Sequence, residues 1–300
     1  ECGYAALHAM GCRKSVLLGS ETGVAVGIYA TEFGQLLSRS PLGRSVFATA
    51  NSLSIASGRL SFVLGMQGPC VSLETACSAS LVAAHSASLA LHHHECETHL
   101  VAGINLMLLQ ASSVGMAIAG MTSPRGRSHT FDNRADGFAR GEGASTFTVV
   151  RGLGELGLQG SAVRQDGRSA SLTAPNGQAQ QGLLRAALTA GGVTVDAMCL
   201  NEAHGTGTAL GDPIEAGSLA ATVLGKRSCG HALAWSSAKA SLAHGESTAG
   251  ATGLLVLISG LSRSRAAPNA QLRTLNPRVG RALQGNSGRC ALPTNASRLA

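Results

Sequence analysis

Cys77 stands where a predicted strand gives way to a predicted helix, a position at which a thiol can act as a nucleophile. The alternating residues 71–75 predict the strand, and the small apolar residues 79–91 predict the helix. A sharp turn between them would expose the thiol and direct free helix N–H groups toward it. Those groups favour a thiolate and can stabilise an oxyanion. An inert, buried thiol is the alternative that the local sequence leaves open.

His204 opens a second segment that could do chemistry, His204-Gly205-Thr206-Gly207-Thr208, after a predicted strand over residues 198–203. Glycine lets a ligand approach the backbone, and the hydroxyls of Thr206 and Thr208 can donate hydrogen bonds to an amide or a phosphate. The segment lacks the Lys-Ser/Thr pair of a Walker loop. A glycine turn that contains a structural histidine is the alternative.

Lys239 and His244 form a third candidate, five residues apart and ahead of an apolar predicted helix over residues 246–261. A histidine there could polarise a carbonyl, and a lysine could orient that histidine. A solvated helix start is the alternative. One cysteine and two histidines at separate element ends match a thiol nucleophile assisted by imidazoles, provided that the fold brings them together.

Strands and helices alternate along the rest of the chain, which predicts an α/β fold with largely parallel, buried strands. We place the division into halves near residues 151–160. The predicted domains are residues 1–153, which carry the cysteine, and residues 154–300, which carry both histidines. The remaining predicted strands cover 24–28, 100–103 and 145–150, and the remaining predicted helices cover 4–10, 45–64, 181–190 and 214–224.

Composition excludes several classes of protein. The 300 residues are 44% hydrophobic and 13% charged, which argues against disorder. The net charge of +7 is scattered, without basic runs and interleaved aromatics, so an acidic protein partner fits better than nucleic acid. None of the eight cysteines forms a Cys-x-x-Cys pair, which favours free thiols in a reducing compartment. No apolar run approaches the ~18 residues that span a bilayer.

Histidines gather in the segment His92-His93-His94-Glu95-Cys96-Glu97 and at His99. A metal site is one interpretation of this pattern. The C-terminal end of the helix that follows Cys77 is the favoured one, because positively charged histidines suit that end of the helix dipole. We therefore expect no bound metal.

Six stretches, in order, resemble β-ketoacyl synthase domains of type I polyketide synthases. The stretch Glu74-Thr75-Ala76-Cys77-Ser78-Ala79 resembles the family's nucleophile motif, and Glu202-Ala203-His204-Gly205-Thr206-Gly207-Thr208 resembles its first histidine motif. The full set of similar segments is 51–65, 68–83, 131–143, 172–177, 202–216 and 239–250. The resemblance covers roughly residues 1–280 and implies a thiolase-like, five-layer α-β-α-β-α sandwich of two related halves.

The resemblance also implies an activity, decarboxylative Claisen condensation in polyketide or fatty acid biosynthesis. Cys77 would carry the acyl group, and His204 and His244 would assist decarboxylation of a malonyl-type thioester. Lys239 would support His244, and Thr206 and Thr208 would contact the pantetheine arm. The expected enzyme is thus an acyltransferase, a 3-oxoacyl synthase.

The same resemblance implies the molecules with which the enzyme would work. No bound cofactor is expected, because substrates arrive on the phosphopantetheine of an acyl carrier protein or on coenzyme A. The acyl carrier protein is the expected partner, and the chain is expected to form a homodimer. We expect a cytoplasmic location, or an organelle if a targeting segment precedes residue 1.

Several positions depart from the family pattern. Ser241 stands where asparagine is usual, and Ala243 stands where glycine is usual, so its side chain should crowd the backbone. The chain opens inside what resembles a later helix, and Thr294-Asn295-Ala296 lacks the usual glycine-rich lead-in and histidine. We therefore expect a domain truncated at both ends. Two further hypotheses are a catalytically impaired partner that dimerises or binds carrier protein, and a thiolase that uses Cys290, whose surroundings lack a glycine-rich loop.

Overall fold

The computed structural model describes residues 1–299 except 30–31, 40, 42–48, 50, 153–155 and 287. The chain divides into two compact units. Unit 1 comprises Glu1–Val114, Gly141–Gly154 and Gly245–Thr252, and unit 2 comprises Gly115–Arg140, Glu155–His244 and Gly253–Ala300. The predicted boundary at 153/154 lies outside the described residues, and the two contiguous halves stay a prediction.

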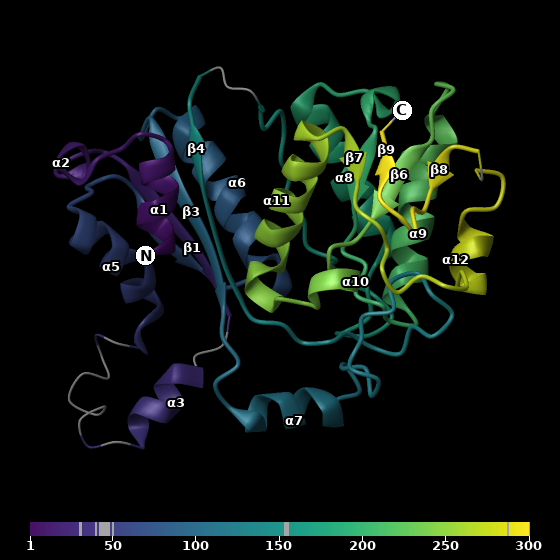
Figure 1. Ribbon diagram of the computed structural model, residues 1–300, viewed down its shortest axis with the longest axis horizontal. Helices are drawn as coiled ribbons and strands as arrows, with labels where there is room; N and C mark the ends of the chain where they lie inside the picture. Colours follow the sequence, from purple (N-terminus) through teal and green to yellow (C-terminus); the bar gives the residue numbers. More distant parts are fainter. Residues whose placement is uncertain are drawn as a thin grey trace. The chain divides into compact units, whose positions relative to one another are not determined.

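A four-stranded sheet in the order β2-β1-β3-β4 forms the centre of unit 1 (Figure 1). The strands β1 (Gly23–Ile28), β2 (Cys70–Leu73) and β3 (Thr98–Asn105) are parallel, as the sequence predicts. Strand β4 (Gly143–Val150) runs antiparallel to β3, so the expectation of largely parallel strands fails at this edge.

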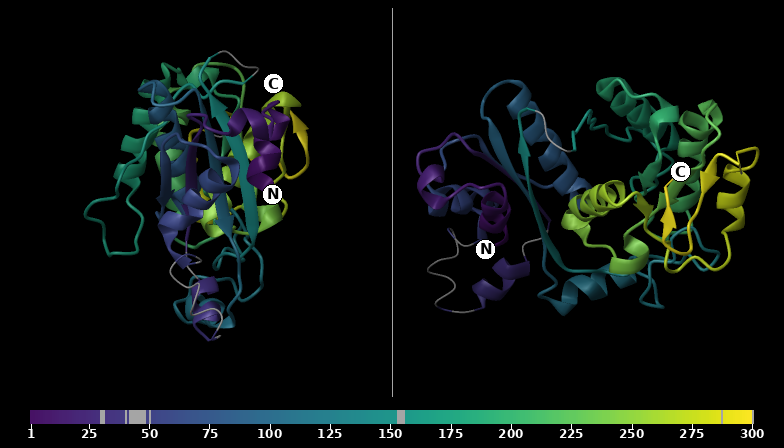
Figure 2. Two further views of the ribbon diagram at one scale, coloured as in Figure 1. Left: turned by 90° about the vertical axis from the view of Figure 1, so that its left-hand side faces the viewer. Right: turned by 45° about the horizontal axis from the view of Figure 1, so that its top comes forward.

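Helices cover both faces of this sheet, because β1 and β3 are apolar on both sides. On one face lie α1 (Cys2–Ala9) and α5 (Leu53–Leu64), whose side chains pack with Val24, Val26 and Leu100. On the other lies α6 (Ala79–His92) (Figure 2). It packs through small residues against Ala25 and Val101. The predicted helix over 45–64 is confirmed from residue 53, and residues 45–48 and 50 lie outside the described residues.

Two glycines bring the start of α6 onto the sheet. Gly27 and Gly103 are paired in register on β1 and β3. A Cβ added at Gly27 would lie 2.4 Å from the Ser80 backbone nitrogen, and one at Gly103 would lie 2.7 Å from the Ser80 Cβ. The two glycines therefore set how closely the first turn of α6 approaches the strands.

The shorter elements of unit 1 and its neighbouring segments complete this part of the fold. Helices α2 (Lys14–Leu17) and α3 (Glu32–Ser38) lie in unit 1, and α7 (Gln110–Ile118) has residues in both units. No helix among the residues that the structure describes is long and apolar enough to cross a membrane.

Unit 2 contains a parallel three-stranded sheet, β5 (Leu200–Glu202), β6 (Leu233–Ser236) and β8 (Cys290–Ala291). A second, antiparallel pair joins β7 (Arg265–Ala266) to β9 (Ser297–Arg298). The core surrounds Trp235, whose ring lies 4.1 Å from that of Phe131, centroid to centroid. Residues from Arg263 onward, which show no pattern in the sequence, thus supply β8 and both strands of the antiparallel pair.

The helices of unit 2 are α8 (Gly177–Gly191), α9 (Gly211–Thr222), α10 (Lys239–Leu242) and α12 (Pro277–Ala282). The helix predicted over 246–261 begins as a 3₁₀ turn (Glu246–Thr248) and continues as α11 (Ala249–Ser262). Helix α11 has residues in both units.

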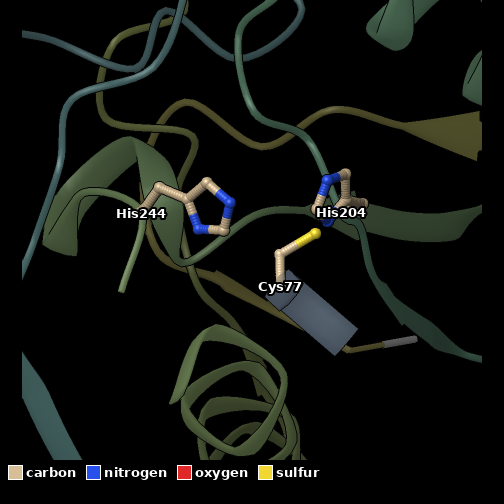
Figure 3. Close-up of side chains that lie close together, drawn as sticks. All are labelled: Cys77, His204 and His244. Carbon is tan, nitrogen blue, oxygen red and sulfur yellow. The ribbon is translucent and has the colours of Figure 1, made fainter. Parts of the chain in front are cut away.

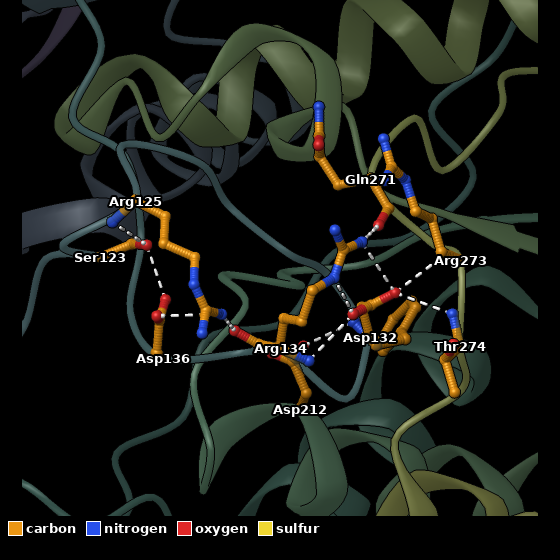
Figure 4. Close-up of polar contacts among 10 residues, drawn as sticks. Ser123, Arg125, Asp132, Arg134, Asp136, Asp212, Gln271, Arg273 and Thr274 are labelled. Carbon is orange, nitrogen blue, oxygen red and sulfur yellow. Dashed lines mark hydrogen bonds and ion pairs between the residues drawn. The ribbon is translucent and has the colours of Figure 1, made fainter.

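Asp132 hydrogen-bonds the loop over residues 128–140 of unit 2 to the segment ahead of α12 (Figure 4). Its carboxylate accepts hydrogen bonds from the Arg134 side chain and from the backbone N–H groups of Arg273 and Thr274, at 2.7, 2.7 and 2.9 Å. Burial alone would raise the pKa of Asp132, but these donors outweigh it and hold the pKa well below its usual range. The loop over residues 128–140 is therefore fixed at its centre.

Candidate active site

Cys77 lies in a single 3₁₀ turn, Ala76–Ser78, between β2 and α6. This arrangement confirms the strand, turn and helix that the sequence predicts. Ala76 has a φ of +50°, a left-handed conformation that costs energy in any residue with a side chain. The Ser78 hydroxyl donates to the Thr75 carbonyl oxygen at 2.7 Å and closes the turn. Cys77 is only partly buried, so its thiol is not an enclosed core residue.

His204 follows β5, and its backbone is held by one carboxylate. Glu215 of α9 accepts hydrogen bonds from the N–H groups of His204 and Gly205, at 2.7 and 2.8 Å, one on each carboxylate oxygen. Gly205 has a φ of +47°, which explains why a glycine follows the histidine. The Thr130 hydroxyl donates to the Gly205 carbonyl oxygen at 2.6 Å.

The rest of the glycine- and threonine-rich segment wraps around Asp212. The Asp212 carboxylate accepts the N–H groups of Gly207 and Thr208, at 3.1 and 3.3 Å, and that of Phe131 at 2.8 Å. The hydroxyl oxygens of Thr206 and Thr208 lie 3.3 Å apart. This network fixes the conformation of the segment, and the contact of the two threonines with a pantetheine arm stays a prediction.

His244 follows α10 after one intervening residue, Ala243, and is anchored to residues 138–140 of the same unit. Its backbone N–H donates to the Ala139 carbonyl oxygen at 2.7 Å, and its ring packs edge-on against Phe138 at 4.9 Å, centroid to centroid. Lys239 and His244 are both buried, so the interpretation of a solvated helix start is wrong. Ala243 has a φ of +63°, a conformation that favours glycine, the residue usual at this position in the family pattern.

The two imidazoles lie together in unit 2, with ring centroids 5.7 Å apart and ring planes nearly perpendicular (Figure 3). Figure 3 also draws Cys77, which belongs to unit 1. Of the residues predicted from the sequence, the structure thus brings together His204 and His244 within one unit.

Both histidines are held in their neutral form. Desolvation lowers the pKa of His244 to about 2, and the positive charge of Lys239 adds to the effect. The same causes, in the same order, lower the pKa of His204. A neutral imidazole carries one N–H donor, the form suited to stabilise a developing oxyanion.

Sequence reasoning assigned no role to three acidic residues of this site, Glu202, Asp212 and Glu215. Burial raises the pKa of Asp212 to about 7 and also raises that of Glu215, although backbone N–H groups oppose the change in both. In the sequence, Glu202 lies at the end of a predicted strand, and Asp212 and Glu215 lie at the start of a predicted helix. Acidic residues in the first turn of a helix are common on protein surfaces, so that signal was weak.

The fold and these residues define a thiolase-like α/β protein, a class shared with solved ketosynthase domains. The chain superimposes with a TM-score of 0.88 on the ketosynthase from module 6 of the bacillaene synthase of Bacillus subtilis 168, at 30% identity over 99% of this chain and 52% of that one. It superimposes with a TM-score of 0.89 on the oxazolomycin ketosynthase domain of Streptomyces albus, at 26% identity over 100% of this chain and 55% of that one.

Residues 1–152 match the model of the β-ketoacyl synthase N-terminal domain, and residues 157–273 match that of the C-terminal domain. The chain therefore belongs to the β-ketoacyl synthase family.

Two relatives are components of the phenolphthiocerol/phthiocerol polyketide synthase of Mycobacterium tuberculosis. The chain is 38% identical to one of these two proteins over 306 aligned residues, which cover 99% of this chain and 19% of that protein. It is 42% identical to the other over 266 residues, which cover 85% of this chain and 12% of that protein. The chain thus spans less than a fifth of the length of these curated relatives.

Proposed function

We propose that this chain is a β-ketoacyl synthase, an acyltransferase that joins an acyl group to a malonyl-type thioester by decarboxylative Claisen condensation. The observation that carries the proposal is the pair of neutral imidazoles, 5.7 Å apart, in a chain whose partly exposed Cys77 begins a helix. Membership of the β-ketoacyl synthase family and similarity to polyketide synthase components support it.

The first half-reaction loads Cys77. Its thiolate attacks the carbonyl carbon of an acyl thioester, and the new carbon–sulfur bond replaces the bond to the carrier or coenzyme A thiol. The departing thiolate takes up a proton. The positive end of the α6 helix dipole favours the attacking thiolate and the tetrahedral oxyanion.

The second half-reaction makes the carbon–carbon bond. A malonyl-type thioester loses CO₂, and N–H groups of His204 and His244 stabilise the enolate oxygen that forms. The enolate carbon then attacks the carbonyl carbon of the acyl-Cys77 thioester. The Cys77 sulfur leaves with the electron pair, and the β-ketoacyl chain stays on the carrier. Thr206 and Thr208 bind the pantetheine arm, and Lys239 maintains the electrostatic environment of the two imidazoles.

The proposed partners are an acyl carrier protein and a second copy of the chain. The net charge of +7 suits an acidic carrier. In unit 1, β2 is an edge strand, and the neighbouring helix α5 exposes Phe62 and Val63, 88% and 56% of whose surfaces are accessible. An unpaired edge beside exposed apolar side chains suits pairing with an identical edge.

None of the described cysteines forms a disulfide, which supports a reducing, cytoplasmic location.

The test is acylation of Cys77. Incubation of the purified chain with an acyl-coenzyme A or acyl-carrier thioester should add the acyl mass to the Cys77 peptide, as detected by mass spectrometry after proteolysis. The Cys77→Ala variant should take up no acyl group, whereas Cys2→Ala, which changes an exposed cysteine outside the proposed machinery, should load like the unmodified chain. A folded chain with no adduct at Cys77 would refute the synthase and leave the carrier-binding partner as the better function.

A further inference from the structure

Two carboxylates bind the backbone of residues 204–208 and leave one N–H group of that segment over. Glu215 accepts the N–H groups of its first two residues, and Asp212 accepts those of its last two. The N–H of Thr206, in the middle, has no acceptor among the residues that the structure describes. Thr206 is 7% exposed, and buried backbone N–H groups nearly always have an acceptor. The unpaired donor therefore indicates a bound molecule that supplies one.

Thr130 fixes the direction of this N–H. Its side chain is fully buried, and its hydroxyl donates to the Gly205 carbonyl oxygen at 2.6 Å. The peptide bond between Gly205 and Thr206 is trans, and the C=O and N–H of a planar trans peptide point in opposite directions. The Thr206 N–H is therefore directed away from Thr130.

Close packing keeps this peptide from turning. A Cβ added at Gly205 would lie 2.7 Å from both the Thr130 Cγ2 and the Ser237 Cβ, and the φ of Gly205 is +47°. The residue after Thr130, Phe131, donates its N–H to the Asp212 carboxylate at 2.8 Å. Two adjacent residues of the Thr130 loop thus hydrogen-bond to groups that shape the segment.

The threonine hydroxyls of the segment add a second donor. Gly211 donates its N–H to the Thr208 Oγ1 at 3.1 Å, and that oxygen lies 3.3 Å from the Thr206 Oγ1. Whichever hydroxyl donates to the other, one hydroxyl proton stays available for a ligand. An N–H and an O–H within three residues suit a ligand with oxygen acceptors, which an acyl-pantetheine has in its amide, thioester and carboxylate groups.

We propose that Thr130 is a positioning residue and that the Thr206 N–H, which it directs, donates a hydrogen bond to an oxygen of the acyl-pantetheine substrate. Because the Gly205 carbonyl is already held by Thr130, the donor needs no rearrangement when the substrate binds. The identity of the ligand rests on the proposed condensation, whereas the orientation of the peptide does not.

The sequence makes the Thr206 N–H accessible to nuclear magnetic resonance. The dipeptide Gly-Thr occurs twice in the chain, at Gly205-Thr206 and at Gly207-Thr208. A sample labelled with [1-¹³C]glycine and [¹⁵N]threonine therefore gives two signals in a carbonyl–amide correlation spectrum, and Thr208→Ser removes one of them. Thr208 is the internal control, because Asp212 already accepts its N–H.

Two ligands test whether the Thr206 N–H binds substrate oxygen. One is coenzyme A, and the other is the amide analogue of malonyl-coenzyme A, in which nitrogen replaces the thioester sulfur so that no acyl transfer occurs. We expect bound ligand to slow solvent exchange of the Thr206 N–H roughly tenfold and to leave that of Thr208 unchanged.

The two ligands also identify the oxygen that accepts. A response of the Thr206 signal to coenzyme A assigns the acceptor to the pantetheine arm. A response to the malonyl analogue alone assigns it to the malonyl group. No response of the Thr206 signal to either compound would overturn the proposal.

Enzyme kinetics test the role of Thr130. Thr130→Val removes the hydroxyl with little change of shape, and we expect KM for the malonyl thioester to rise roughly five- to tenfold with kcat nearly unchanged. Thr130→Ser keeps a hydroxyl and should restore KM. The matched control is Thr146→Val, which removes a hydroxyl that donates to the Cys2 carbonyl oxygen in unit 1 and should leave KM unchanged. An unchanged KM in Thr130→Val would overturn the positioning role.

Failure of this proposal and failure of the proposed function give different results. If Cys77 takes up acyl groups but the Thr206 signal does not respond, the proposal fails and the condensation stands. If Cys77 takes up none while the Thr206 signal responds to coenzyme A, the condensation fails and the donor stands.

A second pair of variants covers the case in which Thr130→Val does not fold, as judged by the fluorescence of Trp235, the only tryptophan. Thr130→Ser and Thr130→Ala then replace it, because they differ only in the hydroxyl. The serine variant should have the lower KM, and equal KM values in this pair would overturn the positioning role.

Discussion

Ala243 places a side chain in a backbone conformation that suits glycine. Its φ is +63° and its ψ is −178°, a region in which residues with a Cβ are rare. The residue lies between α10 and His244, so the hydrogen bond from His244 to Ala139 and the contact with Phe138 must hold the chain in this shape. Strain at this position is therefore maintained by the packing of the histidine.

Replacing Ala243 by glycine should remove this strain. We expect Ala243→Gly to raise the free energy of unfolding by about 1 kcal/mol, because the gain in the folded state exceeds the added freedom of the unfolded chain. Urea denaturation followed by Trp235 fluorescence measures the change. Ala186→Gly, within helix α8, is the matched control and should lower stability by a similar amount. A destabilised Ala243→Gly would show that the left-handed backbone carries no strain.

Sequence reasoning singled out Cys77, His204 and His244 as candidates for chemistry, but it did not single out the acids that bond to the backbone of this site. The strand, turn and helix at Cys77 follow from a change of hydrophobic period that is visible in the chain. No sequence pattern identifies Glu202 or Glu215. Glu202 accepts a hydrogen bond from Ala238, which is distant in sequence, and Glu215 accepts one from the short loop at His204. Buried acids become recognisable only when the backbone donors around them are known.

At the scale of elements, the approach of α6 to its sheet determines where Cys77 lies within unit 1. Gly27 and Gly103 form a flat surface on β1 and β3, and Ser80 lies against it with none of its surface exposed. The Ser80 hydroxyl also accepts the backbone N–H of Ala251 at 2.9 Å. The start of the helix is therefore fixed from the sheet and from the first turn of α11.

A methyl group at residue 27 should displace the start of α6. In Gly27→Ala the new Cβ would lie 2.4 Å from the Ser80 nitrogen, a backbone atom that cannot rotate away. We expect a loss of stability of about 2 kcal/mol or more and slower loading of Cys77. Thermal melts and acylation rates measure the two effects.

The control is Gly58→Ala in α5, where nothing lies within 4 Å and the helix should gain up to about 1 kcal/mol. Similar behaviour of the two variants would contradict the close approach.

Elements that the sequence did not reveal are those with few residues. Strand β8 has two residues, Cys290 and Ala291, and takes its place by pairing with β6 rather than from a pattern of its own. Strand β4 alternates like any half-buried strand, so its sequence could not reveal that it runs antiparallel to β3. Pairing direction depends on how the chain returns to the sheet, which local propensity does not determine.

At the scale of the whole molecule, buried acids make stability depend on pH. The pKa of Glu202 rises from 4.5 to about 7 on folding, and that of Asp212 rises from 3.8 to about 7. The folded chain therefore binds more protons than the unfolded chain between these values. Their contribution to stability is present below the unfolded pKa values and is lost as the pH rises toward 7.

Removing one of these charges should flatten this dependence. We expect Glu202→Gln to gain stability relative to the unmodified chain as the pH rises from about 4.5 to about 7, and to keep that gain at higher pH. Denaturation midpoints measured at about pH 5, 6, 7 and 8 would follow the difference in stability between the two chains. The first three pH values lie within the window set by the two pKa values, and the last lies above it. The same difference at every pH would contradict a raised pKa for Glu202.

The order in which the chain is synthesised matters for unit 1, because its last segment is Gly245–Thr252. Within that segment, Ser247 donates to the Ile104 carbonyl oxygen, Ala251 donates to Ser80, and Thr252 and Ser145 share a hydrogen bond. The residues that precede it in unit 1 are made much earlier, and domains commonly fold during synthesis. The Ser80 hydroxyl therefore receives the Ala251 N–H only after the intervening segment of unit 2, Glu155–His244, has been made. A ribosome stalled before residue 245 would therefore hold a sheet whose helix α6 has not yet received its hydrogen bond from Ala251.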